Sequence, residues 1–246
     1  MHFEFDMLWR GLYSFWVILT FFIALVPIVL CALLVFWLPE HPRLRTFFGF
    51  TKAVIRVWEW ITGYRFSSEG MEHLDQGGPF VIMPNHVNLL DMPVIGPRFS
   101  HPFRPLAKSA FAFYPLLNVL YFFFCIGVNR KSAAHRRASQ DRMLKVLRRG
   151  TSVMIFPEGT RNRTGELLQP FYAGAFHVAI EAQVPIVPVV QLGSHALQPA
   201  STLKFYPGKV LVKVLPPIPT TGLTEADVPD LMDQVKKVML EELNDL

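Results

Sequence analysis

An uninterrupted apolar stretch near the N-terminus constrains this chain most. No residue between Arg10 and Glu40 is charged, and residues 11–38 are apolar almost throughout. A helix that crosses a bilayer needs about 20 such residues. Pro27 lies inside the stretch, and a proline favours a kink or a break in a helix. The sequence therefore predicts a membrane-bound segment and leaves both a crossing helix and an in-plane or re-entrant one open.

The next segment, residues 41–64, mixes basic side chains with large apolar ones. This composition is typical of a helix that lies among lipid headgroups, although a helix packed on the domain would also fit it. If the first segment crosses the bilayer, the basic residues after it place the rest of the chain in the cytoplasm. We expect residues 1–64 to form membrane-anchoring helices, followed by an α/β domain over residues 65–246.

The overall composition agrees with a membrane-associated protein. Hydrophobic residues make up 51% of the 246 residues, and the formal net charge is +5. That charge suits anionic lipid headgroups or an acidic carrier protein as well as nucleic acid. The chain lacks an aromatic-basic RNA motif, and its apolar N-terminus argues against a nucleic-acid partner. Its two cysteines, Cys31 and Cys125, both lie in apolar runs and do not indicate a disulfide framework.

Apolar runs with the length of strands recur through the rest of the chain, with helical stretches between several of them. They are residues 80–83, 152–156, 186–190 and 210–214. This alternation predicts a mixed, largely parallel central sheet flanked by helices. Residues 132–149 are expected to form a crossover helix, and residues 223–246 a closing amphipathic helix.

A histidine and an aspartate follow the first of these runs. His86 lies in the predicted loop between a strand and a helix, and Asp91 lies near the start of that helix. On one continuous helix the two side chains would point about 140° apart, so they meet only if a turn separates them. A histidine held by a carboxylate is a general base that activates a hydroxyl group. No G-x-S-x-G elbow accompanies the pair, which favours the substrate's own hydroxyl as the nucleophile.

Basic residues stand at the ends of later apolar runs. Lys108, Arg130 and Arg161 each occupy such a position. Loops at the carboxyl ends of strands meet at one edge of an α/β sheet, so these side chains can converge on a phosphate. Glu158 is expected to orient a hydroxyl or to hold Arg161, and Gly159 permits close approach of the backbone to a substrate.

The order of these blocks resembles the glycerolipid acyltransferase family, in particular its bacterial-type 1-acylglycerol-3-phosphate O-acyltransferases. The resemblance spans about residues 66–215, and the two-helix membrane-binding motif of the family fits residues 11–64. The blocks that carry it are His-x4-Asp at His86 and Asp91, residues 127–130, Phe-Pro-Glu-Gly-Thr-Arg at residues 156–161, and the apolar run at residues 184–189.

The resemblance implies transfer of an acyl group from a thioester of coenzyme A or acyl carrier protein to the sn-2 hydroxyl of lysophosphatidic acid. It implies a membrane enzyme at the cytoplasmic face, in a bacterium at the inner membrane, with no cofactor and no metal. His86 and Asp91 would be catalytic. The substrate would be bound by Asn85, Lys108, Arg130, Glu158, Gly159, Thr160 and Arg161.

Two other functions remain open at this level. The acceptor can be another lysolipid, such as a lyso-ornithine lipid or a lysophospholipid undergoing remodelling. From a different class, the protein can be a lipid-binding protein without catalytic activity, although intact His86, Asp91 and Glu158 argue against that interpretation.

Overall fold

The computed structural model describes residues 2–75, 77–99, 101–129, 132–200 and 202–244, and the side chains from residue 8 onward. Within these residues seven strands form one sheet with the spatial order β1-β7-β6-β2-β5-β3-β4. All neighbouring strands are parallel except β6 and β7. The predicted mixed, largely parallel sheet is confirmed. The strands are β1 (Arg65–Glu69), β2 (Val81–Pro84), β3 (Phe103–Lys108), β4 (Ile126–Val128), β5 (Ser152–Met154), β6 (Ile186–Leu192) and β7 (Lys209–Val214).

The predicted strands are the ones buried in the middle of the sheet. Every residue of β2, β5 and β6 is buried, as expected for strands covered on both faces. Strand β7 alternates exposed or half-buried residues with buried ones. The strands that the apolar runs did not reveal are β1, β3 and β4. Strand β1 lies at one edge of the sheet and buries only Phe66, and β4 at the other edge has three residues.

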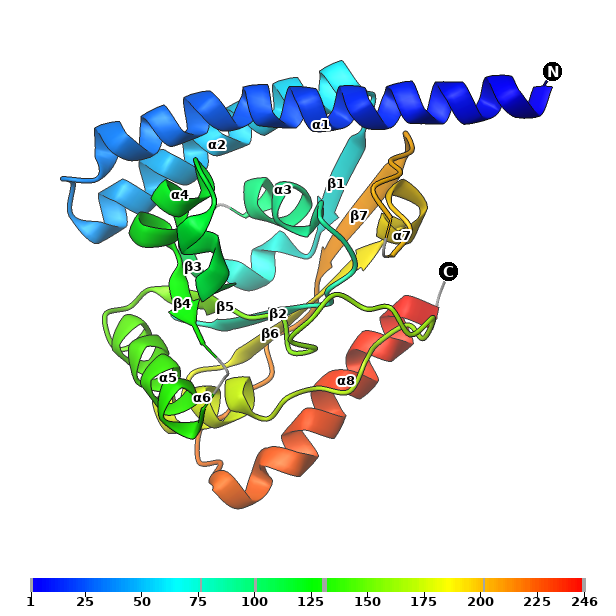
Figure 1. Ribbon diagram of the computed structural model, residues 1–246. Coiled ribbons are helices and arrows are strands. Elements are labelled where there is room, and N and C mark those ends of the chain that lie inside the picture. The colour runs from blue at the N-terminus through cyan, green and yellow to red at the C-terminus, as the bar shows by residue number, and fades with distance from the viewer. Residues whose placement is uncertain (1, 76, 100, 130–131, 201, 245–246) are drawn as a thin grey trace.

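Helices cover both faces of the sheet (Figure 1). Figure 1 shows α1 to α4 on one side of the sheet and α5, α6 and α8 on the other. The helices are α1 (His2–Val35), α2 (Glu40–Thr62), α3 (Asp91–Ile95), α4 (Leu117–Phe124), α5 (Ala133–Leu147), α6 (Gly174–Ala182), α7 (Ser194–Leu197) and α8 (Val228–Asn244), with 3-10 turns η1 (Met71–Leu74), η2 (Gly96–Arg98), η3 (Ser109–Phe113) and η4 (Glu225–Asp227).

Each face of the sheet has its own hydrophobic core. One core joins side chains of α1 and α2 to the sheet residues that face them, and the other joins the sheet to α5, α6 and α8. The closing helix α8 buries Met239, and Val238 beside it is only partly buried. The crossover helix α5 buries Met143, Leu144 and Leu147, and Ala134 in its first turn is exposed.

The N-terminal helices form an antiparallel pair. Helix α1 continues through Pro27 without a break, and residues Leu8–Val35 are long and apolar enough to cross a membrane. The indole Nε1 of Trp58 in α2 donates to Thr20 Oγ1 in α1 at 3.1 Å. Seven residues earlier in α1, the Tyr13 hydroxyl donates to the Thr62 carbonyl at 2.9 Å. These buried polar contacts fix the register of the two helices.

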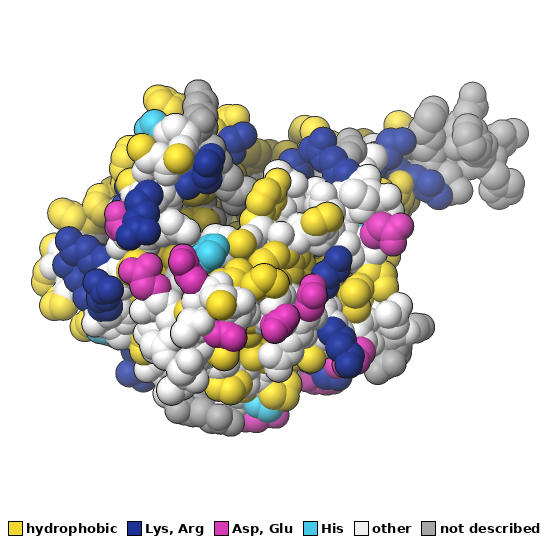
Figure 2. Space-filling model, turned by 90° about the horizontal axis from the view of Figure 1, so that it is seen from below, with side chains coloured by type: hydrophobic (Ala, Val, Ile, Leu, Met, Phe, Trp, Pro, Cys, Tyr) yellow, Lys and Arg dark blue, Asp and Glu magenta, His cyan; other side chains and the backbone are white. Residues whose placement is uncertain are grey.

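The pair also exposes an unusual amount of apolar surface. Soluble proteins rarely leave large contiguous apolar patches in water, so such a surface marks an interaction site. The face of the molecule seen from below, by contrast, mixes side chains of both charges with apolar ones (Figure 2). The large apolar side chains that α1 exposes include Leu8, Trp9, Leu12, Phe15, Trp16, Leu19, Phe22, Ile23, Val26, Leu30, Leu33 and Leu34.

We predict that Trp58→Ala destabilises the fold strongly. Trp58 is 1% exposed and packs against Phe21 and Tyr64, so truncation leaves a cavity between α1 and α2. The expected loss in the free energy of unfolding is about 3–5 kcal/mol. Trp60→Ala, two residues along the same helix, is the matched control because Trp60 is 82% exposed. Its effect in detergent is expected to stay within about 0.5 kcal/mol.

Denaturant titration in detergent solution, followed by far-UV circular dichroism, measures both variants. Equal losses for Trp58→Ala and Trp60→Ala would contradict the packing of α2 described here.

Candidate active site

The predicted His86 loop follows the central strand β2. Its neighbours in the sheet are β5 and β6, both parallel to it, so the loops after β2 and β5 lie side by side at the carboxyl ends of the strands. In open α/β sheets this edge is where ligands bind. A turn over residues 88–90 separates the loop from α3, which begins at Asp91 as expected.

That turn brings His86 and Asp91 together. The Nδ1 atom of His86 lies 2.5 Å from Asp91 Oδ2. The Asp91 carboxylate is 2% exposed, and it also accepts hydrogen bonds from the backbone N–H groups of Val87 at 2.9 Å and Asn88 at 3.1 Å. A buried carboxylate with three donors is well satisfied. It therefore holds both the loop and the imidazole ring in place.

The imidazole ring is fixed on a second side by an aromatic ring. The Phe156 ring stacks on the His86 ring, with centroids 4.1 Å apart and planes 22° from parallel. The His86 side chain keeps 23% of its surface exposed. Because Nδ1 faces Asp91, the Nε2 atom is the ring nitrogen left to meet a ligand.

Glu158 links the two loops through backbone contacts. Its Oε1 accepts from the His86 N–H at 2.7 Å, and its Oε2 accepts from the Gln169 N–H at 3.0 Å. The Asn162 N–H donates to the His86 carbonyl at 2.7 Å, which adds a second link. Burial raises the pKa of Glu158, while the hydrogen bonds from the His86 and Gln169 backbones oppose that rise.

Asn85, the residue before His86, also holds the loop through hydrogen bonds to the rest of the fold. Its side-chain Oδ1 accepts from the Gln191 N–H at 2.8 Å, and the Gln191 side chain donates to the Asn85 carbonyl at 3.0 Å. Asn85 is 3% exposed. These contacts join the end of β2 to β6, so the side-chain oxygen of Asn85 already takes part in a hydrogen bond between strands.

Two of the three predicted phosphate-binding cations lie at the edge of the sheet where the parallel strands end. Lys108 ends β3 and is exposed, and Arg161 lies partly exposed in the loop after β5. Arg130 lies outside the described residues, two positions after the last residue of β4. Gly159 has φ +71°, a left-handed conformation that suits glycine, and its N–H closes a turn onto the Phe156 carbonyl. Thr160 follows it and is exposed.

A cavity of about 380 Å³ adjoins this arrangement. Phe156 lines it, as do its neighbours Pro157 and Gly159, while the side chains of Arg136 and Arg137 come from α5. Phe156 thus contacts both the cavity and the His86 ring, although His86 itself does not line the cavity. Among the described residues no group of three or more His, Cys, Asp or Glu side chains is arranged to hold a metal ion.

A model of the Acyltransferase family matches residues 65–191, the part of the chain that carries all these side chains. The chain belongs to this family. The predicted resemblance is thereby confirmed.

Known acyltransferases align with this chain over more residues than the family model does. The beta form of 1-acyl-sn-glycerol-3-phosphate acyltransferase from Homo sapiens is 36% identical over 187 residues, covering 75% of this chain and 67% of its own length. The alpha form from Homo sapiens is 35% identical over 186 residues, covering 74% of this chain and 65% of its own length. The chain thus spans about two thirds of the length of these curated relatives.

A solved acyltransferase structure shares the fold. The 1-acyl-sn-glycerophosphate (LPA) acyltransferase PlsC from Thermotoga maritima matches with a TM-score of 0.80 and 22% identity. The match covers 97% of this chain and 96% of that one, so it includes the N-terminal helices as well as the α/β domain.

Sequence reasoning missed several residues that shape the acyltransferase site. Phe156 lay within a recognised block, but nothing in the sequence showed that its ring stacks on His86. Gln169 and Gln191 lie far from His86 along the chain and reach the loop only through the fold. A polar residue at the end of the buried strand β6 was the one available signal for Gln191.

We predict that the Glu158 carboxyl makes stability depend on pH. Its pKa in the folded state is raised by burial, so the folded state binds a proton more readily than the unfolded state. The free energy of unfolding should therefore fall as pH rises from about 4.3, the ordinary glutamate value, through the raised pKa.

Glu158→Gln has no titrating group at this position and serves as the reference. Denaturant titrations of both proteins between pH 4 and 7 give the difference in unfolding free energy at each pH. A difference that is constant over this range, or that favours the wild type more as pH rises, would contradict the raised pKa.

Proposed function

We propose that this protein is a 1-acylglycerol-3-phosphate O-acyltransferase, which transfers a fatty acyl group from a thioester to the sn-2 hydroxyl of lysophosphatidic acid. The product, phosphatidic acid, serves phospholipid biosynthesis. The observation that carries the proposal is the buried Asp91 carboxylate, 2.5 Å from His86 Nδ1, within the region that matches the Acyltransferase family. The names of the relatives from Homo sapiens support the choice of acceptor.

His86 is the general base in this proposal. Its Nδ1–H donates to Asp91, so Nε2 takes the proton of the sn-2 hydroxyl as the oxygen attacks the thioester carbonyl. A C–O bond forms, the tetrahedral intermediate collapses, and the C–S bond breaks. The imidazolium then returns its proton to the departing thiolate. Asp91 stabilises the imidazolium while it exists.

The phosphate of the acceptor would be held by cations at the carboxyl edge of the sheet. Lys108 and Arg161 reach this edge from different loops, and Arg130 is proposed to join them on the strength of the sequence block alone. Gly159 and Thr160 offer backbone and hydroxyl groups beside them. Glu158 accepts a hydrogen bond from the His86 backbone, and Asn85 accepts one from the backbone of β6. Both would position the His86 loop without contacting the substrate.

The acyl donor is a thioester of coenzyme A or of acyl carrier protein, acting as co-substrate without a further cofactor. The cavity beside Phe156 is a suitable place for its phosphopantetheine arm. It has apolar lining residues such as Met143 and Ile155 for the arm, and arginine side chains from α5 for a phosphate. Several of its lining residues belong to α5 and α6, which lie on the side of the sheet away from α1 and α2 (Figure 1), so a soluble donor and a membrane-borne acceptor would approach from different sides.

Residues 1–64 would anchor the α/β domain to the membrane, with α1 in the plane of one leaflet. Ser14, in the first half of α1, accepts a hydrogen bond from the Phe205 N–H at 2.9 Å. Just after the C-terminal end of α1, Phe36 contacts the Phe123 ring of α4. Since the α/β domain contacts both the first half of α1 and the residue that follows it, an in-plane orientation keeps that domain outside the bilayer.

The cytoplasmic face is the proposed location, since coenzyme A and carrier-protein thioesters are cytoplasmic. The bacterial-type sequence blocks favour the bacterial inner membrane as the setting. Partners would be membrane lipid, the lysophospholipid acceptor and the thioester donor.

We predict that His86→Ala lowers the rate of acyl transfer by about 10²–10⁴, the usual contribution of a general base. Thiol release in detergent micelles with lysophosphatidic acid and a long-chain acyl-CoA measures it. His195→Ala is the matched control, because His195 is exposed on the short helix α7. It should keep the wild-type rate.

Asp91→Asn tests the second half of the pair. It keeps the shape of the side chain but loses the carboxylate that fixes the Nδ1–H tautomer, so a large loss of rate is expected with the protein still folded.

Unchanged thiol release in His86→Ala would contradict the proposed general-base mechanism. Wild-type turnover with another lysolipid but not with lysophosphatidic acid would replace the acceptor and keep the chemistry.

We predict that Arg161→Ala raises the KM for lysophosphatidic acid about tenfold or more, because a hydrogen bond to a charged group contributes about 1.5–3 kcal/mol. Its rate with a monoacylglycerol, which has no phosphate, should change far less. Arg163→Ala is the control from the same loop, with an exposed side chain. Equal effects of Arg161→Ala on both acceptors would exclude Arg161 from the phosphate site.

A further inference from the structure

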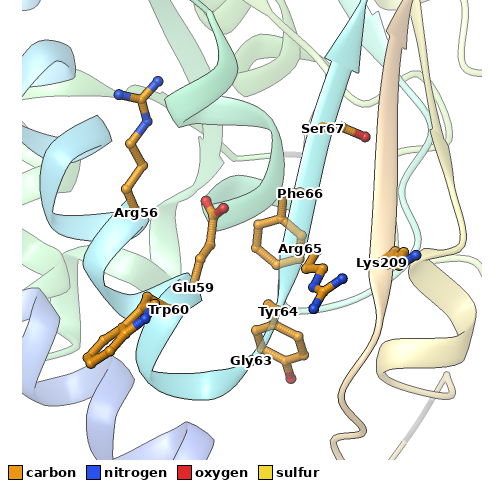
Figure 3. A pocket seen from close by; sticks show the side chains of 9 residues that line it. All are labelled: Arg56, Glu59, Trp60, Gly63, Tyr64, Arg65, Phe66, Ser67 and Lys209. Carbon is orange, nitrogen blue, oxygen red and sulfur yellow. The ribbon is translucent and has the colours of Figure 1, made fainter.

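A second cavity lies away from the catalytic loops, where the C-terminal turn of α2 meets the first residues of β1 and β7 (Figure 3). Its volume is about 680 Å³. None of its lining residues belongs to the His86 or Glu158 loop, and β6 and β7 separate β1 from the catalytic strand β2. The lining residues are Arg56, Glu59, Trp60, Gly63, Tyr64, Arg65, Phe66, Ser67 and Lys209. We call this cavity the edge cleft.

The edge cleft collects positive charge from separate elements. Arg65 of β1 and Lys209 of β7 are directly paired in the parallel ladder, and Arg56 comes from α2. Figure 3 shows the side chains of Arg65 and Lys209 next to each other on the two strands. Like charges on directly paired strand positions destabilise a sheet, so this arrangement costs folding energy.

The protein itself does not neutralise these cations. Within the described part of the chain, no ion pair joins Arg56, Arg65 or Lys209 to a carboxylate. The one acidic lining residue, Glu59, is 9% exposed and pairs with Arg98 behind the cleft. The pKa of Arg98 is lowered by burial and, to a smaller extent, by the charge of Arg56.

The rim of the edge cleft belongs to the apolar surface of the helix pair. Trp60 is 82% exposed, and Val57 and Ile61 are 58% and 40% exposed on the same part of α2. The indole of Trp16 in α1 donates to the Ile61 carbonyl at 3.3 Å, so exposed apolar groups of both helices meet here. Exposed tryptophans of this kind settle at the headgroup level of a bilayer.

We propose that the edge cleft binds the phosphate headgroup of an anionic membrane phospholipid at a site distinct from that of the acceptor. Arg65, Lys209 and Arg56 would contact the phosphate, while Trp60 and its apolar neighbours would lie against the acyl region. Arginine offers planar paired donors that suit phosphate oxygens. The lipid would neutralise the cations that the protein leaves without partners and hold this end of the helix pair at the membrane surface.

The proposal depends on the membrane placement of α1 and α2 and not on the transfer chemistry. Its test uses the full-length protein and contains no acyl donor. Sedimentation with phosphatidylcholine vesicles, with and without phosphatidylglycerol, measures the partition of the protein between lipid and water. A failure of the acyltransferase assay would therefore leave this test intact.

The test variant is Arg65→Gln with Lys209→Gln. The matched control is Lys236→Gln with Lys237→Gln, which removes the same charge from α8, on the other side of the sheet (Figure 1). Each cation near an anionic surface contributes about 1 kcal/mol, so the test variant should lose on the order of tenfold or more in partition to phosphatidylglycerol vesicles. Binding to neutral vesicles should stay at wild-type values in both variants. The thermal unfolding midpoint should stay at the wild-type value in the control variant and should not fall in the test variant, which loses the like-charge pair.

Three results would overturn the proposal. The first is equal loss in the test and control variants, which would reveal a general effect of net charge. The second is a wild-type protein that binds neutral and anionic vesicles equally well. The third is release of the wild-type protein from anionic vesicles by millimolar inorganic phosphate at constant ionic strength, which would assign the cleft to a free phosphate.

Discussion

Two buried carboxylates hold the His86 loop, and the rest of the candidate site depends on them. Asp91 binds the imidazole and the N–H groups of the two residues that follow His86. Glu158 binds the N–H of His86 itself. A buried charge without partners is very costly, so each carboxylate forces the surrounding N–H groups into one arrangement. The loop is thereby ordered before any substrate arrives, which is the condition for efficient general-base catalysis.

The helix pair at the N-terminus shares a hydrophobic core with the sheet that carries the His86 loop. Its buried residues belong to the hydrophobic core that also contains Ile82, in the strand that leads into the His86 loop, and Val187, the partner of Ile82 in β6. The proposed boundary between residues 64 and 65 would separate membrane anchoring from acyl transfer, but one continuous hydrophobic core joins the two parts. A rigid link of this kind would keep the His86 loop at a constant height above the lipid from which the acceptor comes.

Charge is distributed between the two proposed phosphate sites by the topology of the sheet. Lys108 and Arg161 stand at the carboxyl ends of β3 and β5, where parallel strands deliver their loops. Arg65 and Lys209 stand at the starting ends of β1 and β7. Because β7 runs antiparallel to β6, these ends lie at the same edge of the sheet, on strands farther from β2 and beside the last turn of α2. One group would bind the phosphate of the substrate, and the other would bind a lipid that is not consumed.

The sequence by itself determined the helix pair, the buried strands and the spacing of His86 and Asp91, because each depends on a local pattern of apolar residues and turns. It also identified the family through unbroken blocks. Only the tertiary structure decided that Phe156 stacks on His86, that Glu158 and Asn85 serve the loops, and that Arg65 lies beside Lys209. Those contacts join residues far apart in the chain, and the packing of the sheet, which no local pattern encodes, brings them together.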